Sequence, residues 1–180
     1  MSRHLDWDGC FNVRDLGGLP LPGGRLTRWG AMVRADALDR LTADGWDALL
    51  AHGVRTIIDL RNDDERGADA APRPPAVTTL HLPLDVSDDR EFWDVWQTGP
   101  QFGTPLYYGP HLERFADRSA AVIAAIADAA PGGVAIHCAG RRARSRQLAM
   151  LLPAPAGAAL GDLAADYTLS AASAPARLAR

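Results

Sequence analysis

Cys138 and Arg144 are the two residues whose types and spacing most clearly suggest chemistry, with five residues between them. A loop of that length between a strand and a helix can surround a tetrahedral anion with backbone N–H groups, next to the positive end of the helix. Such surroundings convert a thiol, which ordinarily titrates at about 8.5, into a thiolate that can attack phosphorus. Arg144 then offers a planar fork of donors to two phosphoryl oxygens. The pair predicts a site for nucleophilic phosphoryl transfer.

The neighbours of this pair have matching roles. Ser145 can hydrogen-bond the sulfur and ease its departure in a second step, and His137 would orient the loop through backbone contacts. The anion itself would be bound by the residues in between, which are Ala139, Gly140, Arg141, Arg142 and Ala143. A lone cysteine after a strand is more often a buried small hydrophobic residue, and arginines on a loop are often simply solvated. The succession of strand, His-Cys, five residues, Arg-Ser and helix nevertheless favours the anion-binding loop.

The composition suits one soluble domain over residues 1–180. The chain is 47% apolar and 23% charged, and its 180 residues can bury a core without staples. A net charge of −3 provides no basic field to attract nucleic acid or an anionic membrane. Cys10 and Cys138 form neither a disulfide framework nor a metal-ligand pattern, which favours a reducing, cytoplasmic location. No segment reaches the ~20 apolar residues of a membrane span, and the oligomeric state stays open.

Hydrophobic patterning and turn chemistry predict alternating strands and helices. The predicted elements are, in chain order, a hairpin or edge strand over 26–33, a helix over 42–53, strands over 54–60 and 77–82, a helix over 111–130 and a strand over 134–136. This alternation predicts an α/β fold of three layers, with helices on both sides of a mainly parallel central sheet. The Cys138 loop would then lie at the carboxyl end of a central strand, where such sheets bind their ligands.

Three segments depart from this regular alternation. Residues 84–110 are acidic at first and then rich in aromatic residues, glycine and proline. Long insertions in compact domains are usually functional or disordered, and the aromatic content here favours a lid with one short helix. Pro153 and Pro155 interrupt the helix expected after the loop. Residues 171–180 are predicted to form a flexible tail.

Further motifs occur in the order found in the atypical bacterial tyrosine/serine protein phosphatases, which the chain resembles over most of residues 5–170. These motifs are Asn12-Val-Arg-Asp-Leu-Gly-Gly18, Arg28-Trp-Gly30 with Arg34-Ala-Asp36, Thr56-Ile-Ile-Asp-Leu-Arg61, His81-Leu-Pro-Leu84, the His-Cys-x5-Arg-Ser loop and Asp166-Tyr-Thr-Leu-Ser170. The resemblance implies hydrolysis of phosphotyrosine, often of phosphoserine or phosphothreonine, and in some cases of phosphoinositides. It implies a phosphocysteine intermediate, no metal or other cofactor, and phosphorylated proteins or small phosphomonoesters as partners.

The resemblance also implies that a carboxylate near the loop acts as general acid. Asp85 follows the 81–84 segment at the start of the insertion, where related phosphatases carry an acid on a mobile loop, although a simple turn aspartate is an equal alternative. Asp15 belongs to the N-terminal motif that packs near the loop in the family, and is therefore a second candidate and a substrate contact. An aspartate in a turn with glycines more often caps its own backbone.

The loop departs from the family pattern His-Cys-x-x-Gly-Lys-Asp-Arg-Thr-Gly. Arg141 replaces a glycine, Arg142 replaces a lysine, Ala143 replaces an aspartate and Arg146 replaces the last glycine. Arg142 keeps a cation, whereas Arg141 loses backbone freedom and Ala143 loses a carboxylate. Three functions therefore stay open: an active phosphatase, a degenerate phosphatase fold that binds phosphorylated ligands with little turnover, and a rhodanese-like sulfurtransferase. The loop length and the N-terminal motif speak against the last.

Overall fold

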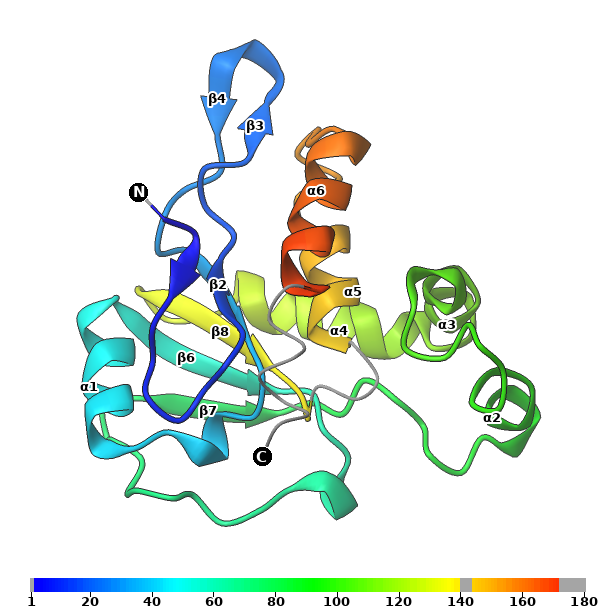
Figure 1. Cartoon of the computed structure of the whole chain (residues 1–180), viewed down its shortest axis with the longest axis horizontal. Coiled ribbons are helices and arrows are strands. Elements are labelled where there is room, and N and C mark those ends of the chain that lie inside the picture. Colours follow the sequence, from blue (N-terminus) through cyan, green and yellow to red (C-terminus); the bar gives the residue numbers. More distant parts are fainter. Residues whose placement is uncertain (1, 140–143, 172–180) are drawn as a thin grey trace.

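The computed structural model describes residues 2–139 and 144–171, which form a six-stranded sheet flanked by helices (Figure 1). The strands of this sheet are β1 His4–Leu5, β2 Val13–Asp15, β5 Met32–Ala35, β6 Val54–Asp59, β7 Thr78–His81 and β8 Gly133–His137. A separate hairpin consists of β3 Pro20–Leu21 and β4 Arg25–Leu26. The strand order is β1-β2-β5-β8-β6-β7, in which β5, β8, β6 and β7 run parallel and β2 pairs antiparallel with both β1 and β5. The prediction of an α/β fold with a mainly parallel sheet is confirmed.

Helices cover both faces of this sheet. Within the described residues they are α1 Ala43–Ala51, α2 Arg90–Trp96, α3 Tyr108–Arg114, α4 Ala116–Ala127, α5 Arg144–Leu151 and α6 Leu160–Ala171. Ala135 of β8 packs in one apolar cluster with Trp46 of α1, whereas Ile136 packs in another with Val122 of α4 and Leu148 of α5. Because successive side chains of a strand point to opposite faces, these two clusters lie on opposite sides of the sheet and make the three predicted layers.

Strand β8 occupies the middle of the sheet and is buried along its whole length. The register places Ala35, His137 and Asp59 side by side at the carboxyl ends of β5, β8 and β6. Cys138 follows directly, and α5 begins at Arg144. The end of a central parallel strand and the start of a helix therefore enclose the loop, as the sequence predicts.

Local signals account well for the first helix. The Thr42 hydroxyl oxygen accepts a hydrogen bond from the Gly45 N–H at 3.3 Å and caps α1. The chain leaves this helix through Gly53, whose positive φ of 96° suits glycine. Strands β6 and β7 follow at the predicted positions, and α5 ends at Leu151, just before the proline-containing stretch.

Two elements differ from the prediction. The stretch 26–33, expected to form a hairpin or an edge strand, begins at the end of the β3–β4 hairpin and ends in β5, which lies inside the sheet between β2 and β8 because β1 and β2 add to its outer side. The helix expected over 111–130 begins earlier and is divided at Phe115, whose φ of −120° and ψ of 40° are not helical. The Phe115 ring is buried in an aromatic cluster with Phe92, Trp93, Tyr107 and Tyr108, so tertiary packing breaks the helix.

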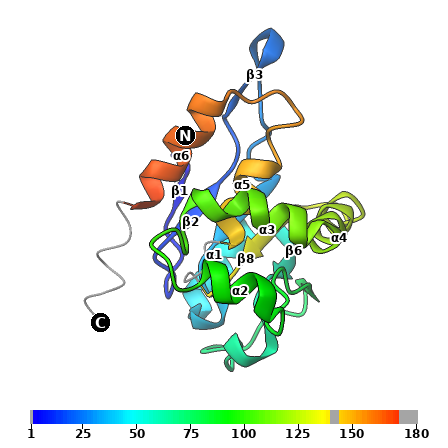
Figure 2. The ribbon, with the colours of Figure 1, turned by 90° about the vertical axis from the view of Figure 1, so that its right-hand side faces the viewer.

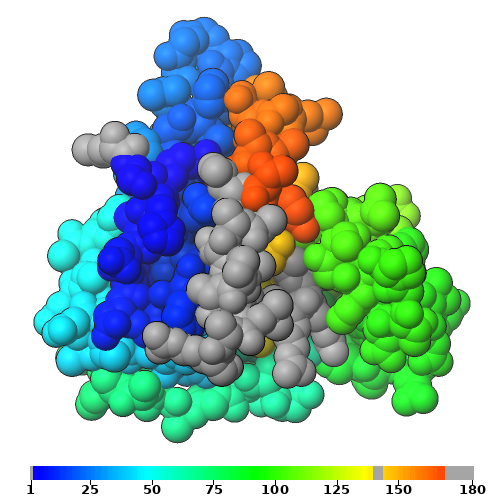
Figure 3. Space-filling model, in the orientation of Figure 1, coloured from blue at the N-terminus to red at the C-terminus, as the bar shows by residue number. Residues whose placement is uncertain are grey.

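The insertion at 84–110 contains the predicted short helix, α2, and a 3-10 turn at Pro105–Tyr107 that leads into α3. Seen from the side of the insertion, α2, α3 and α4 lie next to one another (Figure 2). The aromatic cluster of this region also contacts Met150 of α5 and Tyr167 of α6. The N-terminal segment, α6 and the helices α2 and α3 appear together on one face of the molecule (Figure 3). The insertion is thus packed against the helix that follows the Cys138 loop.

Candidate active site

Cys138 lies at the carboxyl end of the sheet and is only 1% exposed. Its Sγ is 3.5 Å from Oγ of Ser145 in the first turn of α5. The Ser145 hydroxyl donates to the carbonyl oxygen of Ala35 at 3.3 Å, and it can turn its single hydrogen to the sulfur when the sulfur is charged. The structure therefore brings Ser145 into the position from which a sulfur could be stabilised.

Arg144 is completely buried and is fixed by acceptors on several sides. Its Nη1 and Nη2 donate to the two carboxylate oxygens of Glu65, both at 2.6 Å. Nη1 also lies 3.2 Å from the carbonyl oxygen of Leu60 and 3.3 Å from Oδ2 of Asp85. Burial acts to lower the pKa of the guanidinium, but the Glu65 hydrogen bonds and the charges of Cys138 and Asp85 raise it above its ordinary value. Arg144 is thus a fixed and permanent cation.

One donor of this guanidinium is not used by any of the described residues. Among the described residues, Nε of Arg144 has no hydrogen-bond partner although it is buried. An unsatisfied buried donor costs about 1–3 kcal/mol, so a missing acceptor is expected there. This donor belongs to the residue that closes the Cys138 loop.

Glu65 is a site residue that the sequence analysis did not identify. It ends the 3-10 turn Asp63–Glu65 that follows β6, and its Oε2 also accepts the backbone N–H of Asn62 at 2.9 Å. The spacing of Asn62 and Glu65 is that of a capping box, which was the available signal. Capping boxes are common, however, and this pattern does not predict that the same carboxylate accepts hydrogen bonds from an arginine.

Asp85 lies next to Arg144, and its expected role as a general acid stays a prediction. Its Oδ2 is 3.3 Å from Nη1 of Arg144, and its Oδ1 is 2.9 Å from Nε2 of His111 on α3. An ionised carboxylate only accepts hydrogen bonds, so in this pair His111 carries its hydrogen on Nε2. Both oxygens of Asp85 face donors, an arrangement that suits a charged partner of Arg144 better than a proton donor.

His137 is buried at the end of β8, and among the described residues neither of its ring nitrogens has a hydrogen-bond partner. Burial lowers its pKa to about 4, although the Asp59 carboxylate, whose Oδ1 is 3.6 Å from Nε2, acts in the opposite direction. His137 is therefore neutral near pH 7. Its expected role in orienting the loop stays a prediction.

Asp15 lies at the end of β2, opposite Val33 of β5. Strand β2 is antiparallel to β5 and leads away from the carboxyl end of β8. The Asp15 carboxylate accepts the backbone N–H groups of Gly17 at 2.7 Å and Gly30 at 2.8 Å, and its Oδ2 lies 2.8 Å from Nε2 of His52. These contacts satisfy a turn. Among the described residues, the Asp15 carboxylate therefore closes that turn, and its expected contact with a substrate stays a prediction.

The loop residues themselves are described only in part. Ala139 is half-buried directly after Cys138. The predicted substrate contacts of Gly140, Arg141, Arg142 and Ala143 fall on residues outside the described part of the chain, and these contacts stay predictions. Downstream, Nη1 of Arg146 donates to the Tyr167 hydroxyl at 3.4 Å, and its guanidinium lies 5.4 Å from the centre of that ring. Arg146 therefore faces α6 rather than the partners of Arg144.

The other cysteine and the potential metal ligands among the described residues form no second reactive centre. Cys10 donates weakly to the carbonyl oxygen of Ala37 at 3.5 Å, and burial, together with Asp36, raises the pKa of its thiol far above the ordinary value. Neither cysteine forms a disulfide. The described residues contain no group of three or more His, Cys, Asp or Glu side chains that could hold a metal ion. None of the helices in the described ranges is long and apolar enough to cross a membrane.

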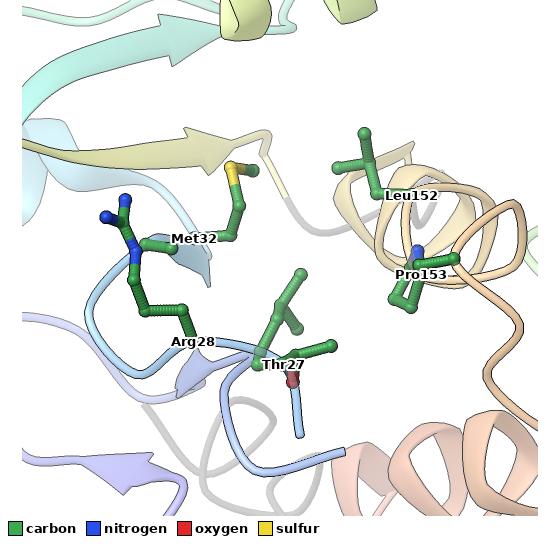
Figure 4. Close-up of a pocket in the computed structure, with 8 residues that line it drawn as sticks. Thr27, Arg28, Met32, Leu152 and Pro153 are labelled. Atoms are coloured by element: carbon green, nitrogen blue, oxygen red, sulfur yellow. Dashed lines mark hydrogen bonds between the residues drawn. The ribbon is translucent and has the colours of Figure 1, made fainter. Parts of the chain in front are cut away.

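An apolar cavity lies beside the amino end of β5, with Thr27, Arg28 and Met32 on one side and Leu152 and Pro153 on the other (Figure 4). Its lining consists of Leu16, Thr27, Arg28, Ala31, Met32, Leu152, Pro153 and Ala156, and its volume is about 130 Å³. Typical ligand pockets start at about 300 Å³. The cavity is too small for such a ligand, and the chemistry of the molecule is concentrated at the other end of this strand.

The fold and the site together define an α/β protein with a cysteine–arginine loop at the end of a central parallel strand. Residues 5–180 match the model of the tyrosine phosphatase family, and the chain belongs to this family. A protein of Cupriavidus necator that is named as an inferred tyrosine-protein phosphatase is 29% identical over 173 residues. This match covers 92% of the present chain, which spans 63% of the length of that curated relative.

Proposed function

We propose that the chain is a cysteine-dependent phosphatase that hydrolyses monoesters of the phosphotyrosine type. The observation that carries this proposal is the state of Arg144, which is buried, held by Glu65 at 2.6 Å through both Nη atoms, and left with an Nε donor that has no partner among the described residues. A phosphoryl oxygen in the loop would satisfy that donor. Family membership and the position of Cys138 support the same conclusion.

The reaction would proceed in two displacements. The Cys138 thiolate attacks phosphorus, a P–S bond forms, the P–O bond to the ester oxygen breaks and the phenolate leaves. Water then attacks the phosphocysteine, the P–S bond breaks, and inorganic phosphate and the thiolate are released. Arg144 would stabilise the phosphoryl oxygens in both steps, and Ser145 would stabilise the departing sulfur from its position 3.5 Å away.

The surroundings of Asp85 bear on the choice of substrate. Both of its oxygens face donors, Arg144 and His111, so we assign it to Arg144 rather than to protonation of the leaving group. A phenol, with a pKa of about 10, leaves as an anion far more readily than an alcohol. We therefore expect aryl phosphates to be hydrolysed at least a hundredfold faster than alkyl phosphates such as phosphoserine.

Turnover of p-nitrophenyl phosphate by the wild type and three variants tests this proposal. Cys138→Ser and Arg144→Ala should each lower the rate by at least a thousandfold, because they remove the nucleophile and the phosphate clamp. Cys10→Ser is the matched control, since it removes the other thiol, and it should keep the rate within twofold. A wild type that transfers sulfur from thiosulfate to cyanide instead would select the sulfurtransferase alternative.

A second candidate function is phosphate binding with little turnover. The departures at Arg141 and Ala143 from the family pattern favour it. The test is thermal unfolding with orthovanadate, because a ligand at 100 times its Kd stabilises the folded state by about 2.7 kcal/mol. Stabilisation that is lost in Arg144→Ala, combined with no turnover above that of Cys138→Ser, would replace the first proposal by this one.

A further inference from the structure

His111 connects the aromatic insertion to the arginine of the site. It lies on α3 and is completely buried. Its Nε2 donates to Oδ1 of Asp85 at 2.9 Å, and its Nδ1 lies 3.1 Å from Nε2 of Gln147 on α5. Because Nδ1 of this tautomer is an acceptor, the Gln147 amide donates to it. The other oxygen of Asp85 is 3.3 Å from Nη1 of Arg144.

These contacts form a closed circuit. It runs from Gln147 through His111 and Asp85 to Arg144, and Gln147 and Arg144 are both on α5, three residues apart. Residues three apart on a helix lie on the same face. The circuit therefore ties one face of α5 to His111 of α3 directly through Gln147, and a second time through Asp85, which contacts the Arg144 guanidinium.

Four aromatic rings fix the imidazole within this circuit. The ring centres of Phe92, Trp93, Tyr107 and Phe115 lie 5.9, 6.0, 5.7 and 4.9 Å from that of His111. Each of the four rings is itself buried. Hydrogen bonds in such buried, aromatic surroundings are electrostatically stronger than in water, and an unpaired polar group there is costly. The imidazole thus has one arrangement that satisfies both of its nitrogens.

We propose that His111 is a positioning residue of the phosphatase site, a role that rests on the function proposed above. Glu65 grips Arg144 from one direction, and Asp85 reaches Nη1 from another. Loss of the His111 donor removes a hydrogen bond from a buried carboxylate, and a carboxylate that turns to replace this bond would withdraw Oδ2 from Arg144. By holding Asp85 in place, His111 fixes the plane of the guanidinium and with it the direction of the Nε donor.

Two substitutions separate this role from mere packing. His111→Phe keeps a ring among the aromatic side chains but removes the donor to Asp85. His111→Gln keeps a donor, because the glutamine amide nitrogen can reach the place of Nε2. The chain offers a matched control in His52, whose Nε2 lies 2.8 Å from Oδ2 of Asp15 at the other end of the sheet. His52→Phe breaks a similar pair that does not contact Arg144.

The experiment measures orthovanadate affinity together with kcat and KM for p-nitrophenyl phosphate. His111→Phe should raise the vanadate Kd and lower kcat/KM by at least tenfold each, which corresponds to about 1.4 kcal/mol. His111→Gln should recover both quantities to within threefold of the wild type. His52→Phe should lower the melting temperature and leave both quantities within twofold.

Several outcomes would overturn the proposal. Wild-type vanadate affinity in folded His111→Phe would do so, and so would an equal loss in His111→Gln, because that loss would reflect packing alone. If His111→Phe does not fold, Asp85→Asn tests the same link, and an unchanged vanadate Kd there would be equally decisive against it. If the wild type shows neither turnover nor vanadate binding that depends on Cys138, the phosphatase proposal is overturned as well. If the wild type is active and His111→Phe has the same kcat/KM and vanadate Kd, only the present inference is overturned.

Discussion

Two histidine–aspartate pairs lie at opposite ends of the sheet with almost the same geometry. In one, Nε2 of His52 is 2.8 Å from Oδ2 of Asp15, and in the other, Nε2 of His111 is 2.9 Å from Oδ1 of Asp85. The pairs differ in the third partner of the carboxylate. Asp15 accepts two backbone N–H groups of a turn, whereas Asp85 contacts the guanidinium of Arg144. The chemical types in a pair therefore do not define its role; the next contact does.

The two pairs also differ in solvent exposure. The His52 side chain is 24% exposed, while His111 and Asp85 are completely buried. Water screens the first pair in part, and charge interactions in the second act at a lower effective dielectric constant. A change in the His111–Asp85 pair should therefore alter the position or the electrostatic surroundings of the Arg144 guanidinium. This contrast predicts stability effects from the first pair and binding effects from the second.

Substitution of Glu65, which holds Arg144, should cause the largest loss of turnover and stability. The Asp85 pair differs from the Asp15 pair because it contacts this guanidinium. Glu65→Gln replaces one acceptor oxygen by an N–H group that faces a donor, and breaking a buried ion pair costs about 3–5 kcal/mol. We expect turnover of p-nitrophenyl phosphate to fall at least a hundredfold, and the free energy of unfolding, measured in urea, to fall by about 3 kcal/mol.

Asp63→Asn is the control for that substitution. Asp63 belongs to the same 3-10 turn, but its side chain is 87% exposed, and its ion pair with Arg66 lies at the surface. Surface ion pairs contribute about 0–1 kcal/mol, so stability and turnover should be almost unchanged. Equal losses of turnover and stability in both variants would mean that the 3-10 turn itself is needed, rather than the hydrogen bonds from Arg144 to Glu65.

The second-largest effect is a pH dependence of stability that comes from His137, which lies at the end of β8 and belongs to neither of the two pairs. Its folded-state pKa of about 4 lies below the ordinary value of 6.5, so the unfolded chain takes up the proton first as the pH falls. The stabilising contribution is complete above pH 6.5 and is lost progressively down to pH 4, about 3 kcal/mol in all. Urea unfolding at pH 7, 6, 5 and 4 should show this decline in the wild type. A similar decline in folded His137→Leu would contradict the assignment.

The third prediction addresses the two carboxylates directly. Asp15→Asn should lower the free energy of unfolding by about 2 kcal/mol, because hydrogen bonds to a charged acceptor are lost, with vanadate affinity within twofold of the wild type. Asp85→Asn should raise the vanadate Kd about tenfold through the looser hold on Arg144, which is about 1.4 kcal/mol. Thermal unfolding and vanadate titration of both variants provide the measurement. A vanadate Kd that rises equally in Asp15→Asn would erase the distinction between the two pairs.

Local sequence signals explain which parts of the fold could be predicted. The Thr42 cap, the exit at Gly53 and the β-branched run of β6 all act within a few residues. The break at Phe115 could not be predicted, because its cause is an aromatic cluster assembled from separate segments. The interior position of β5 follows likewise from pairing with β2 and β8, which no local pattern encodes.

The same distinction holds for the site. Cys138, Arg144 and Ser145 were accessible because they are close together in the sequence. Glu65 is 79 residues from the arginine that it holds, and His111 is 36 residues from Gln147, so neither shows a spacing that indicates a site. Asp15 was identified only as part of a motif, and a motif gives no information on the direction in which its strand runs or on the turn that its carboxylate closes.

The smallest effect is expected at Arg146, which has the family glycine's place in the loop pattern but faces α6. It is the residue before Gln147, yet it contacts Tyr167 and not the circuit through His111. Arg146→Met keeps a long apolar stem over the ring and loses the cation, so the cost should be about 0.5–1 kcal/mol of stability. Turnover and vanadate affinity should stay within twofold of the wild type. A tenfold change in turnover would mean that the influence of α5 on the site is not confined to the face that carries Arg144 and Gln147.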